Sequence, residues 1–210
     1  MQIRRYESPL LKSNMYIVTE GRHAIVLDPF QDISPAEGLV IDKIILTHEH
    51  YDHISGVNLW KEKTQASVLC SAACAENIKY PTKNLSRIFE VFCGLQTWVR
   101  LETAPKYEPG YTCTADEIFT DKFSFGWAGH QWELFEIPGH SRGSIGIMLD
   151  ESCFFSGDSL LEHDETETRL PGGSTRQWTE LGRPRLERLP EGIRVCPGHF
   201  KEFTYSKERT

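Results

Sequence analysis

The sequence feature that most constrains this chain is the segment "IILTHEHYDHISG", which runs from Ile44 to Gly56. Three histidines, a glutamate and an aspartate fall within six positions, directly after a run of branched apolar residues. Such groups repel or desolvate one another at the end of a buried strand unless a cation offsets the cost. The segment therefore predicts a strand that ends in metal ligands.

The same arrangement recurs further along the chain. The tripeptide Pro-Gly-His follows an apolar strand pattern twice, ending at His140 and at His199, and two other strand patterns end at Asp28 and Asp158. Glycine or proline breaks each strand, and the next residue emerges at the rim of the sheet. If these strands share a rim, their imidazoles and carboxylates converge there. Together they form a ligand set suited to zinc, iron or manganese.

The spacing inside the first cluster predicts two directions for its side chains. Alternation along an extended segment places His48 and His50 on one side. Asp52 and His53 lie at the start of the helix that we expect next, so they point elsewhere. One cluster can therefore supply ligands to two metals.

Histidines and serines outside these positions are expected to have ordinary structural roles. A single histidine after a strand is interpreted as a hydrogen-bonded turn residue, and serines beside glycine as turn or capping residues. The residues interpreted in this way are His23, His130, His163, Ser141, Ser144 and Ser159. His163 lies close enough to Asp158 in the sequence to stay a candidate for a supporting contact.

Composition and charge exclude several classes of protein. Hydrophobic residues make up 39% and charged residues 25% of the 210 positions, which suits one globular domain. The apolar runs are too short for a transmembrane helix and the N-terminal segment lacks a signal-peptide pattern, so we expect a cytoplasmic protein with no membrane partner. Six cysteines without a C-x-x-C pair predict free, buried thiols. A formal charge of −7 argues against nucleic acid as a partner.

Strand patterns occupy both halves of the chain. "MYIVTEGRHAIVLDPF" predicts two strands joined by a turn at Glu20 and Gly21, and "DKIILT" predicts a third strand that is buried on both faces. A helix over "ISGVNLWKEKT" and a strand over "ASVLC" follow. A second β-rich half begins at Lys122, and its expected strands are "KFSFGW", "HQWELFEIP", "SIGIMLD", "SCFFSGD" and "GIRVCP".

Residues 77–127 fit no simple structural unit and are interpreted as an aromatic-rich insertion. One helix is expected over residues 84–98, followed by irregular chain. The aromatic residues of this insertion are Phe89, Phe92, Trp98, Tyr107, Tyr111 and Phe119. We favour packing of these rings against the body of the protein. A substrate lid is the alternative, because long loops in compact domains are often functional.

The segment "THEHYDH" resembles the H-x-H-x-D-H signature of the metallo-β-lactamase superfamily. The later His140, Asp158 and His199 match the remaining ligand motifs of that family in order, so the resemblance spans residues 28–199. It implies a fold of the α/β (α+β) class, a four-layer αββα sandwich, formed by residues 1–210 as a single domain. It also implies a dinuclear metal site along one edge of the two sheets.

The resemblance further implies a role for each residue of the site. His48, His50 and His140 would hold the first metal. Asp52, His53 and His199 would hold the second metal, and Asp158 would bridge both. Asp28 would support the ligand loop without being a ligand. The implied cofactor is two Zn²⁺ ions per chain, with iron or manganese as the alternatives at one or both positions.

A dinuclear site of this kind implies a hydrolytic mechanism. Two cations held there would lower the pKa of a shared water molecule and would polarise the carbonyl that it attacks. Asp52 and Asp158 are the predicted catalytic carboxylates. Tyr51 is either a hydrogen-bond donor to the substrate or a packing residue. The candidate substrate contacts are Tyr51, Arg142 and Arg169.

Small features separate the branches of the superfamily. The commonest true β-lactamases resemble one another in having cysteine at the position of Asp158, and flavodiiron-type relatives have glutamate at the position of His50, so both are disfavoured. A ribonuclease would need a basic face. The arginines of residues 169–194 alternate with glutamates, and this pattern favours the solvated surface of a helix.

The remaining branch resembles glyoxalase II and includes thioesterases, lactonases and persulfide dioxygenases. Its G-R-T-D segment before L-P-G-G corresponds here to residues 166–169, "TETR", which puts the usual glutathione thioester and persulfide substrates in doubt. We expect no C-terminal glutathione-gripping domain, because the chain ends eleven residues after His199.

We therefore expect a zinc-dependent hydrolase that acts on a small ester or thioester. The alternatives are a persulfide dioxygenase with one iron, a lactonase or phosphodiesterase, and, ranked last, a non-catalytic sensor. The sequence leaves the oligomeric state open.

Overall fold

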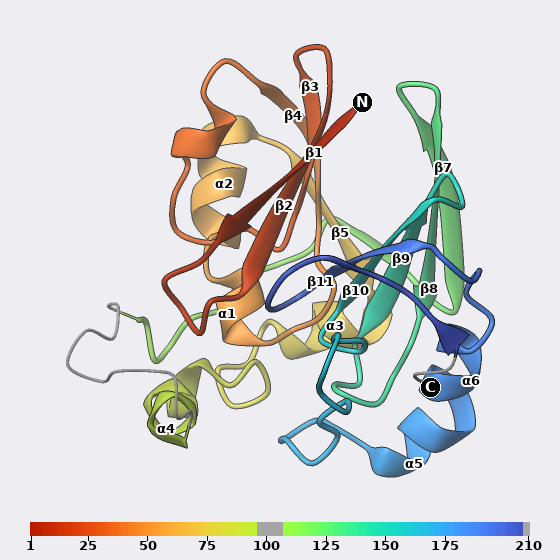
Figure 1. Ribbon diagram of the computed structural model, residues 1–210. Coiled ribbons are helices and arrows are strands. Elements are labelled where there is room, and N and C mark those ends of the chain that lie inside the picture. The colour runs from red at the N-terminus through yellow and green to blue at the C-terminus, as the bar shows by residue number, and fades with distance from the viewer. Residues whose placement is uncertain (96–106, 208–210) are drawn as a thin grey trace.

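The computed structural model describes residues 1–95 and 107–207 and contains two six-stranded sheets that face each other (Figure 1). The first sheet has the order β1-β2-β3-β4-β5-β6. Its strands β1 to β3 are antiparallel, whereas β3 to β6 are parallel. The bounds are β1 Gln2–Glu7, β2 Asn14–Glu20, β3 His23–Leu27, β4 Val40–Ile45, β5 Ser67–Ser71 and β6 Glu117–Phe119.

The second sheet has the order β12-β11-β10-β9-β8-β7 and comes from the second half of the chain. Strands β7 to β10 pair as an antiparallel meander, and β11 then pairs with β10 in the parallel direction. The bounds are β7 Lys122–Trp127, β8 His130–Glu136, β9 Ile145–Leu149, β10 Cys153–Gly157, β11 Arg194–Pro197 and β12 Phe203–Thr204.

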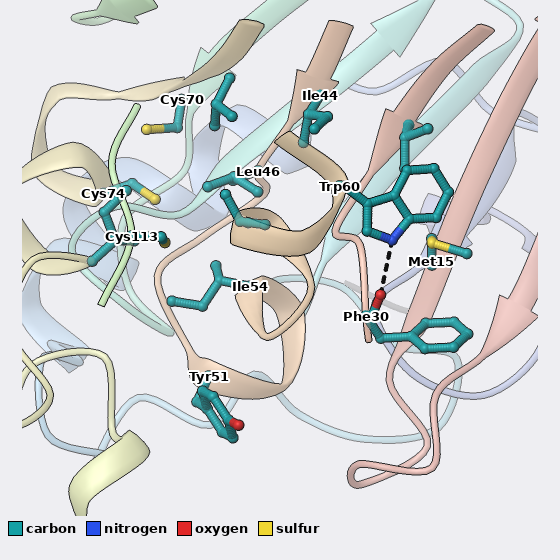
Figure 2. Close-up of a cluster of buried hydrophobic side chains, with 14 of the residues drawn as sticks. Met15, Phe30, Ile44, Leu46, Tyr51, Ile54, Trp60, Cys70, Cys74 and Cys113 are labelled. Atoms are coloured by element: carbon teal, nitrogen blue, oxygen red, sulfur yellow. Dashed lines mark hydrogen bonds between the residues drawn. The ribbon is translucent and has the colours of Figure 1, made fainter. Parts of the chain in front are cut away.

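Helices α1 (Tyr51–Ile54), α2 (Val57–Thr64) and α3 (Ala72–Asn77) cover the outer face of the first sheet (Figure 1). The largest side chain in this layer is Trp60, which is fully buried against Met15 and donates its indole N–H to the backbone oxygen of Phe30 at 2.9 Å (Figure 2). The bond satisfies the one polar atom of a large apolar ring, and it ties α2 to the segment after β3.

Two further apolar layers complete the sandwich. Between the sheets, Trp132 stacks on Phe155 with ring centroids 6.2 Å apart, and residues of β2, β3 and β4 pack against them. On the outer face of the second sheet, Leu186 and Leu189 pack with Phe154 in a separate cluster. The chain thus has the order helices, sheet, sheet, helices, and the predicted four-layer αββα sandwich is confirmed.

The helical layer on the second sheet is short and exposed on its outer side. It consists of α5 (Thr175–Gln177), a π-helical segment (Trp178–Gly182) and α6 (Arg183–Leu186). Arg176 pairs with Glu180 and Arg183 with Glu187, each at i,i+4 spacing on the surface. The expected solvated helix surface is therefore present in this stretch.

The predicted insertion at 77–127 is only partly separate from the sheets. The expected helix over 84–98 is a 3-10 turn (Ser86–Ile88) followed by α4 (Phe89–Leu95), and Trp98 lies outside the described residues. The end of this range contributes β6 to the first sheet and β7 to the second. Of its described aromatic residues, Phe89, Tyr111 and Phe119 are buried as expected, the first two against Tyr51, whereas Tyr107 is half-buried and Tyr80 is exposed.

The other expected strands occur at their predicted places, and the helix expected over residues 54–64 is divided into α1 and α2. The structure adds elements that were not expected: β1, β6, β12, α3 and a short 3-10 helix (Ser34–Ala36). All six cysteines are free and buried, as predicted. In the part of the chain that the structure describes, no helix has the length and apolar character needed to cross a membrane.

Candidate metal centre

The strand directions bring the predicted ligands to one rim of the sandwich. Because β3 and β4 are parallel, Asp28 and His48 follow them at the same edge of the first sheet. Strands β8, β10 and β11 run in one direction, so the residues after them share an edge of the second sheet. A backbone hydrogen bond from Ile145 N to Thr47 O, 2.8 Å long, joins the two edges.

One group of donor atoms is formed by His48, His50 and His140, all buried. His50 Nδ1 and His140 Nε2 face each other at 3.0 Å. Zinc–nitrogen bonds of about 2.0–2.1 Å place neighbouring donors about 3.3 Å apart around a tetrahedral ion. The spacing of these two nitrogens is therefore close to that of two neighbouring ligands of one zinc ion.

A second group is formed by Asp52, His53 and His199. His53 Nε2 lies 3.3 Å from His199 Nε2, and Asp52 Oδ2 lies 3.5 Å and 3.4 Å from these two nitrogens. As expected, Asp52 and His53 come from the first turn of α1 and His199 from the loop after β11. These spacings again match the edges of a tetrahedral site.

Asp158 lies between the two groups. Its Oδ2 atom is 3.4 Å from His140 Nε2 and 3.9 Å from His48 Nε2 in the first group, and 3.3 Å from His199 Nε2 in the second. One carboxylate oxygen thus faces donors of both groups at once. This is the position that the predicted bridging role requires.

The remaining polar atoms of the ligands are held by the surrounding chain. Asp28 accepts hydrogen bonds from His53 Nδ1 at 3.0 Å, from Thr47 N at 2.7 Å and from the Thr47 hydroxyl. It adopts a left-handed backbone conformation, with φ of 51°, which aspartate tolerates better than most residues. His140 Nδ1 donates to the backbone oxygen of Glu167 at 2.9 Å. Such contacts fix the tautomer and the direction of a ligand ring.

The electrostatics of the two groups differ. Burial lowers the pKa of His48 well below its usual value and that of His50 to about 3, so both imidazoles are neutral, the form that binds a metal. Burial also lowers the pKa of His199, but the Asp158 and Asp52 carboxylates together more than offset it and raise this pKa to about 9. His53 behaves in the same way, because Asp158 and Asp52 raise its pKa well above the usual range. Positive charge is thus favoured between the carboxylates.

The donor set and its burial fit divalent cations. His48 Nε2 is buried and has no hydrogen-bond partner among the described residues, although a buried polar nitrogen needs one. Imidazole nitrogens and carboxylate oxygens are common ligands of zinc. The residues that would hold such ions are His48, His50, His140, Asp52, His53, His199 and Asp158.

Glu49 is a structural residue of the site that the sequence interpretation missed. It is 1% exposed, and its carboxylate accepts hydrogen bonds from Ser141 Oγ at 2.7 Å, Asn77 Nδ2 at 2.7 Å and Gly143 N at 3.3 Å. Burial raises its pKa. Since it lies between His48 and His50, alternation could have indicated that it points inward, away from the metals. Its contacts link the first ligand loop to the loop of His140.

The candidate substrate contacts have different surroundings from those expected. Tyr51 is fully buried; its hydroxyl accepts a hydrogen bond from Glu108 N at 2.9 Å, and its ring packs on Phe89 (Figure 2 shows Tyr51 at the edge of the apolar layer). This favours the packing role. Arg169 is exposed and forms an ion pair with Glu167, and Arg142 is also exposed. Neither arginine lines the cavity beside the ligands.

That cavity has a volume of about 530 Å³ and opens beside both ligand groups. Its lining includes His50, Asp52, His140, Asp158 and His199. The other residues of its wall are Leu11, Tyr51, Leu85, Phe89, Leu161, Asp164, Glu165, Glu167, Leu170 and Phe200. A small substrate can therefore reach the carboxylate that faces both groups.

The three histidines expected to be structural lie away from the ligands. His23 pairs with Asp42 and His130 with Asp150 at the surface. His163 is 78% exposed and lies beside Glu162, so no contact with Asp158 is present. Among the serines, Ser141 and Ser144 form a buried loop network and Ser159 N closes a turn onto Ser156 O.

Comparisons with known proteins agree with this fold. A family model described as the metallo-β-lactamase superfamily matches residues 9–199. An uncharacterized protein of Mycobacterium tuberculosis is 28% identical over 225 aligned positions, which cover 100% of this chain and 95% of that protein. A hydroxyacylglutathione hydrolase of Photorhabdus laumondii is 25% identical, and the match covers 94% of this chain and 66% of that protein. The crystal structure of BLEG-1, a B3 metallo-β-lactamase, has a TM-score of 0.80 and 25% identity, with 99% and 96% of the two chains covered.

Proposed function

Because the chain belongs to the metallo-β-lactamase superfamily, we propose that it is a hydrolase that holds two zinc ions and cleaves a small ester or thioester. The superfamily supports a metal-dependent enzyme with divalent cations. The observation on which the proposal of two ions mainly rests is the position of Asp158 Oδ2 between the two donor groups. We also propose that the protein is cytoplasmic and acts on a small molecule, not on nucleic acid.

Each part of the site has a task in this reaction. Divalent cations would supply Lewis acidity and would lower the pKa of a water molecule. The chain itself orients the ligands: Asp28 fixes His53, the backbone of Glu167 fixes His140, and Glu49 fixes the loops that present them. The apolar wall formed by Leu85, Phe89 and Leu161 can accept an acyl group.

Two observations argue against a persulfide dioxygenase and a phosphodiesterase. The second donor group, with Asp52, His53 and His199, argues for two ions, whereas a persulfide dioxygenase would use one iron. A phosphodiester would call for a cationic side chain in the cavity, and no lysine or arginine is among the described residues that line it. The likeness to a hydroxyacylglutathione hydrolase supports a thioester.

Two measurements on the same protein preparation test the proposal: the metal content per chain and the rate of hydrolysis of a substrate panel. Elemental analysis is expected to give two zinc ions per chain, and a panel of thioesters, esters, lactones and phosphodiesters is expected to show turnover with the first two classes. Replacement of Asp158 by alanine is expected to lower kcat/KM by about a thousandfold, because it removes the carboxylate shared by both groups.

A surface variant serves as the control for this test. Glu151 is exposed in the turn between β9 and β10, and Glu151→Ala is expected to retain metal and activity. A fully active Asp158→Ala protein, or a metal-loaded wild type that cleaves no ester or thioester, would contradict the proposed function.

A further inference from the structure

The cavity beside the metal ligands has a mixed wall of apolar and acidic side chains. Six of its lining residues are leucine or phenylalanine: Leu11, Leu85, Phe89, Leu161, Leu170 and Phe200. Burial of an apolar group against such a wall is favourable. The wall therefore suits a substrate with a short aliphatic or aromatic acyl group.

Three carboxylates lie on one side of the cavity, in the segment that follows Asp158. They belong to Asp164, Glu165 and Glu167. Glu167 is neutralised by its ion pair with Arg169 and by the backbone N–H of the same residue. Asp164 and Glu165 are exposed and have no hydrogen bond or ion pair with a described residue, and they lie on the rim shared by this cavity and a neighbouring one lined by Trp178.

No positive side chain balances these carboxylates at the described part of the cavity wall. Arg169 points to solvent, with 85% of its side chain exposed, and Arg142 does not line the cavity. A cavity of about 530 Å³ is about 10 Å across, so a charge inside it lies within about one Debye length of the wall at physiological salt. The charge of a bound substrate is therefore sensed by Asp164 and Glu165.

We propose that this cavity selects thioesters or esters whose leaving group is cationic or neutral over those whose leaving group is anionic. Asp164 and Glu165 are the specificity-determining residues, while the apolar wall holds the acyl group. The inference rests on the proposed function and names the substrate class of the same site. It sets this chain apart from enzymes that act on anionic thiol carriers, because two carboxylates without a cationic side-chain partner would repel such a carrier.

Three thioesters with the same acyl group test the inference. Butyrylthiocholine has a cationic leaving group, S-butyryl-N-acetylcysteamine a neutral one and S-butyryl-3-mercaptopropionate an anionic one. We expect kcat/KM to fall in this order, with about a tenfold difference between the cationic and anionic substrates at low salt. The difference is expected to shrink as ionic strength rises.

Replacing Asp164 and Glu165 by neutral residues tests whether these two carboxylates cause the preference for a cationic leaving group. The double variant Asp164→Asn, Glu165→Gln is expected to bring the ratio of cationic to anionic kcat/KM to within about twofold, with little change for the neutral substrate. Glu151→Gln, at the opposite end of β10, is the matched control and is expected to leave the ratio unchanged. An equal or higher kcat/KM for the anionic substrate, or a ratio that survives the double variant, would overturn the inference.

A binding measurement separates this inference from the proposed function. Thioether analogues of the three compounds, in which a methylene replaces the carbonyl, cannot be cleaved, and calorimetry gives their dissociation constants. The same order of affinity without any turnover of the thioesters would contradict the proposed function and support the selectivity. Turnover with the opposite order of affinity would support the proposed function and overturn the selectivity.

Discussion

Two buried carboxylates organise the ligands without belonging to either donor group. Asp28 holds Thr47 and His53, and Glu49 joins the first ligand loop to Ser141 and Gly143. Each carboxylate is surrounded by donors, which offsets the cost of its burial. At the scale of single residues, the site therefore depends on groups that need not touch a metal or a substrate.

Replacement of Glu49 tests this supporting role. Glu49→Leu is expected to lower the free energy of unfolding by about 2–4 kcal/mol, because the buried donors on Ser141, Asn77 and Gly143 lose their acceptor. Glu49→Gln keeps one acceptor oxygen and is expected to lose about 1 kcal/mol. Urea denaturation measures both, with Glu62→Gln as an exposed control. Equal stability of wild type and Glu49→Leu would contradict the role.

Replacement of Asp28 is expected to act on the second donor group. In Asp28→Asn one oxygen is lost, so the hydrogen bonds to Thr47 and His53 cannot all be kept. Metal affinity is expected to fall by about 10- to 100-fold at one of two sites, since a ligand imidazole loses its orienting partner. Titration against a chelator of known affinity measures this change. Two sites of unaltered affinity would show that Asp28 has no influence on His53.

At the scale of elements, the turns that end the strands determine where the ligands lie. Gly198 comes between Pro197 and His199, and a Cβ atom there would collide with Asp158 Oδ1 and would lie 2.8 Å from the backbone carbon of Gly157. The strand patterns alone could not reveal this close approach, because it joins two turns, at Gly157 and Gly198, that lie 41 residues apart in the chain.

The variant Gly198→Ala is therefore expected to damage the metal site more than the fold. We expect it to bind at most one metal ion tightly while its circular dichroism spectrum stays that of the wild type. Gly126→Ala is the control, because a Cβ atom at Gly126 meets no atom within 4 Å. Two tightly bound ions in Gly198→Ala would mean that Asp158 and His199 can move apart without loss.

The helices and strands could be predicted from the sequence where the pattern of apolar residues is strong. β4 and α1 could be expected, because apolar residues in β4 are followed directly by the histidine cluster. β1 was missed because it is a half-exposed edge strand with Arg4 and Arg5 inside it, and β6 because it has only three residues. Their places depend on pairing with β2 and β5, which local patterns do not encode.

At the scale of the whole molecule, the site exists only because both halves of the chain meet. His48 to His53 come from the first sheet and its helices, whereas His140, Asp158 and His199 follow strands of the second sheet. The order of the ligand motifs could be predicted from the sequence through a family resemblance. The distances between these ligands and the residues that line the cavity could not be predicted from the sequence, because they depend on how the two sheets pack.

The buried histidines and carboxylates between the two sheets predict that the free energy of unfolding depends on pH in the metal-free protein but not in the metal-loaded protein. Without metal, His199 has a pKa raised to about 9 by Asp158 and Asp52, against the opposing effect of burial. Its contribution to stability is fully present below the usual histidine pKa and is lost as pH rises through about 9. The free energy of unfolding of the chelator-treated protein is therefore expected to fall between pH 7 and pH 10.

A bound metal ion takes the place of the protons on His53 and His199. The free energy of unfolding of the metal-loaded protein is therefore expected not to fall between pH 7 and pH 10. Metal binding near pH 7 is expected to release protons from His53 and His199, and this release should decline as pH approaches about 9. Calorimetry in buffers of different ionisation enthalpy counts the protons. Binding without proton release at pH 7 would contradict the assignment of these two histidines to the second ion.

The most direct measurement is an anomalous difference map, recorded at the zinc absorption edge, from crystals of the metal-loaded protein. We predict two peaks on either side of Asp158 Oδ2, one beside His48, His50 and His140 and the other beside Asp52, His53 and His199. A single peak, or peaks remote from Asp158, would contradict the proposal that the two halves of the chain share a dinuclear centre.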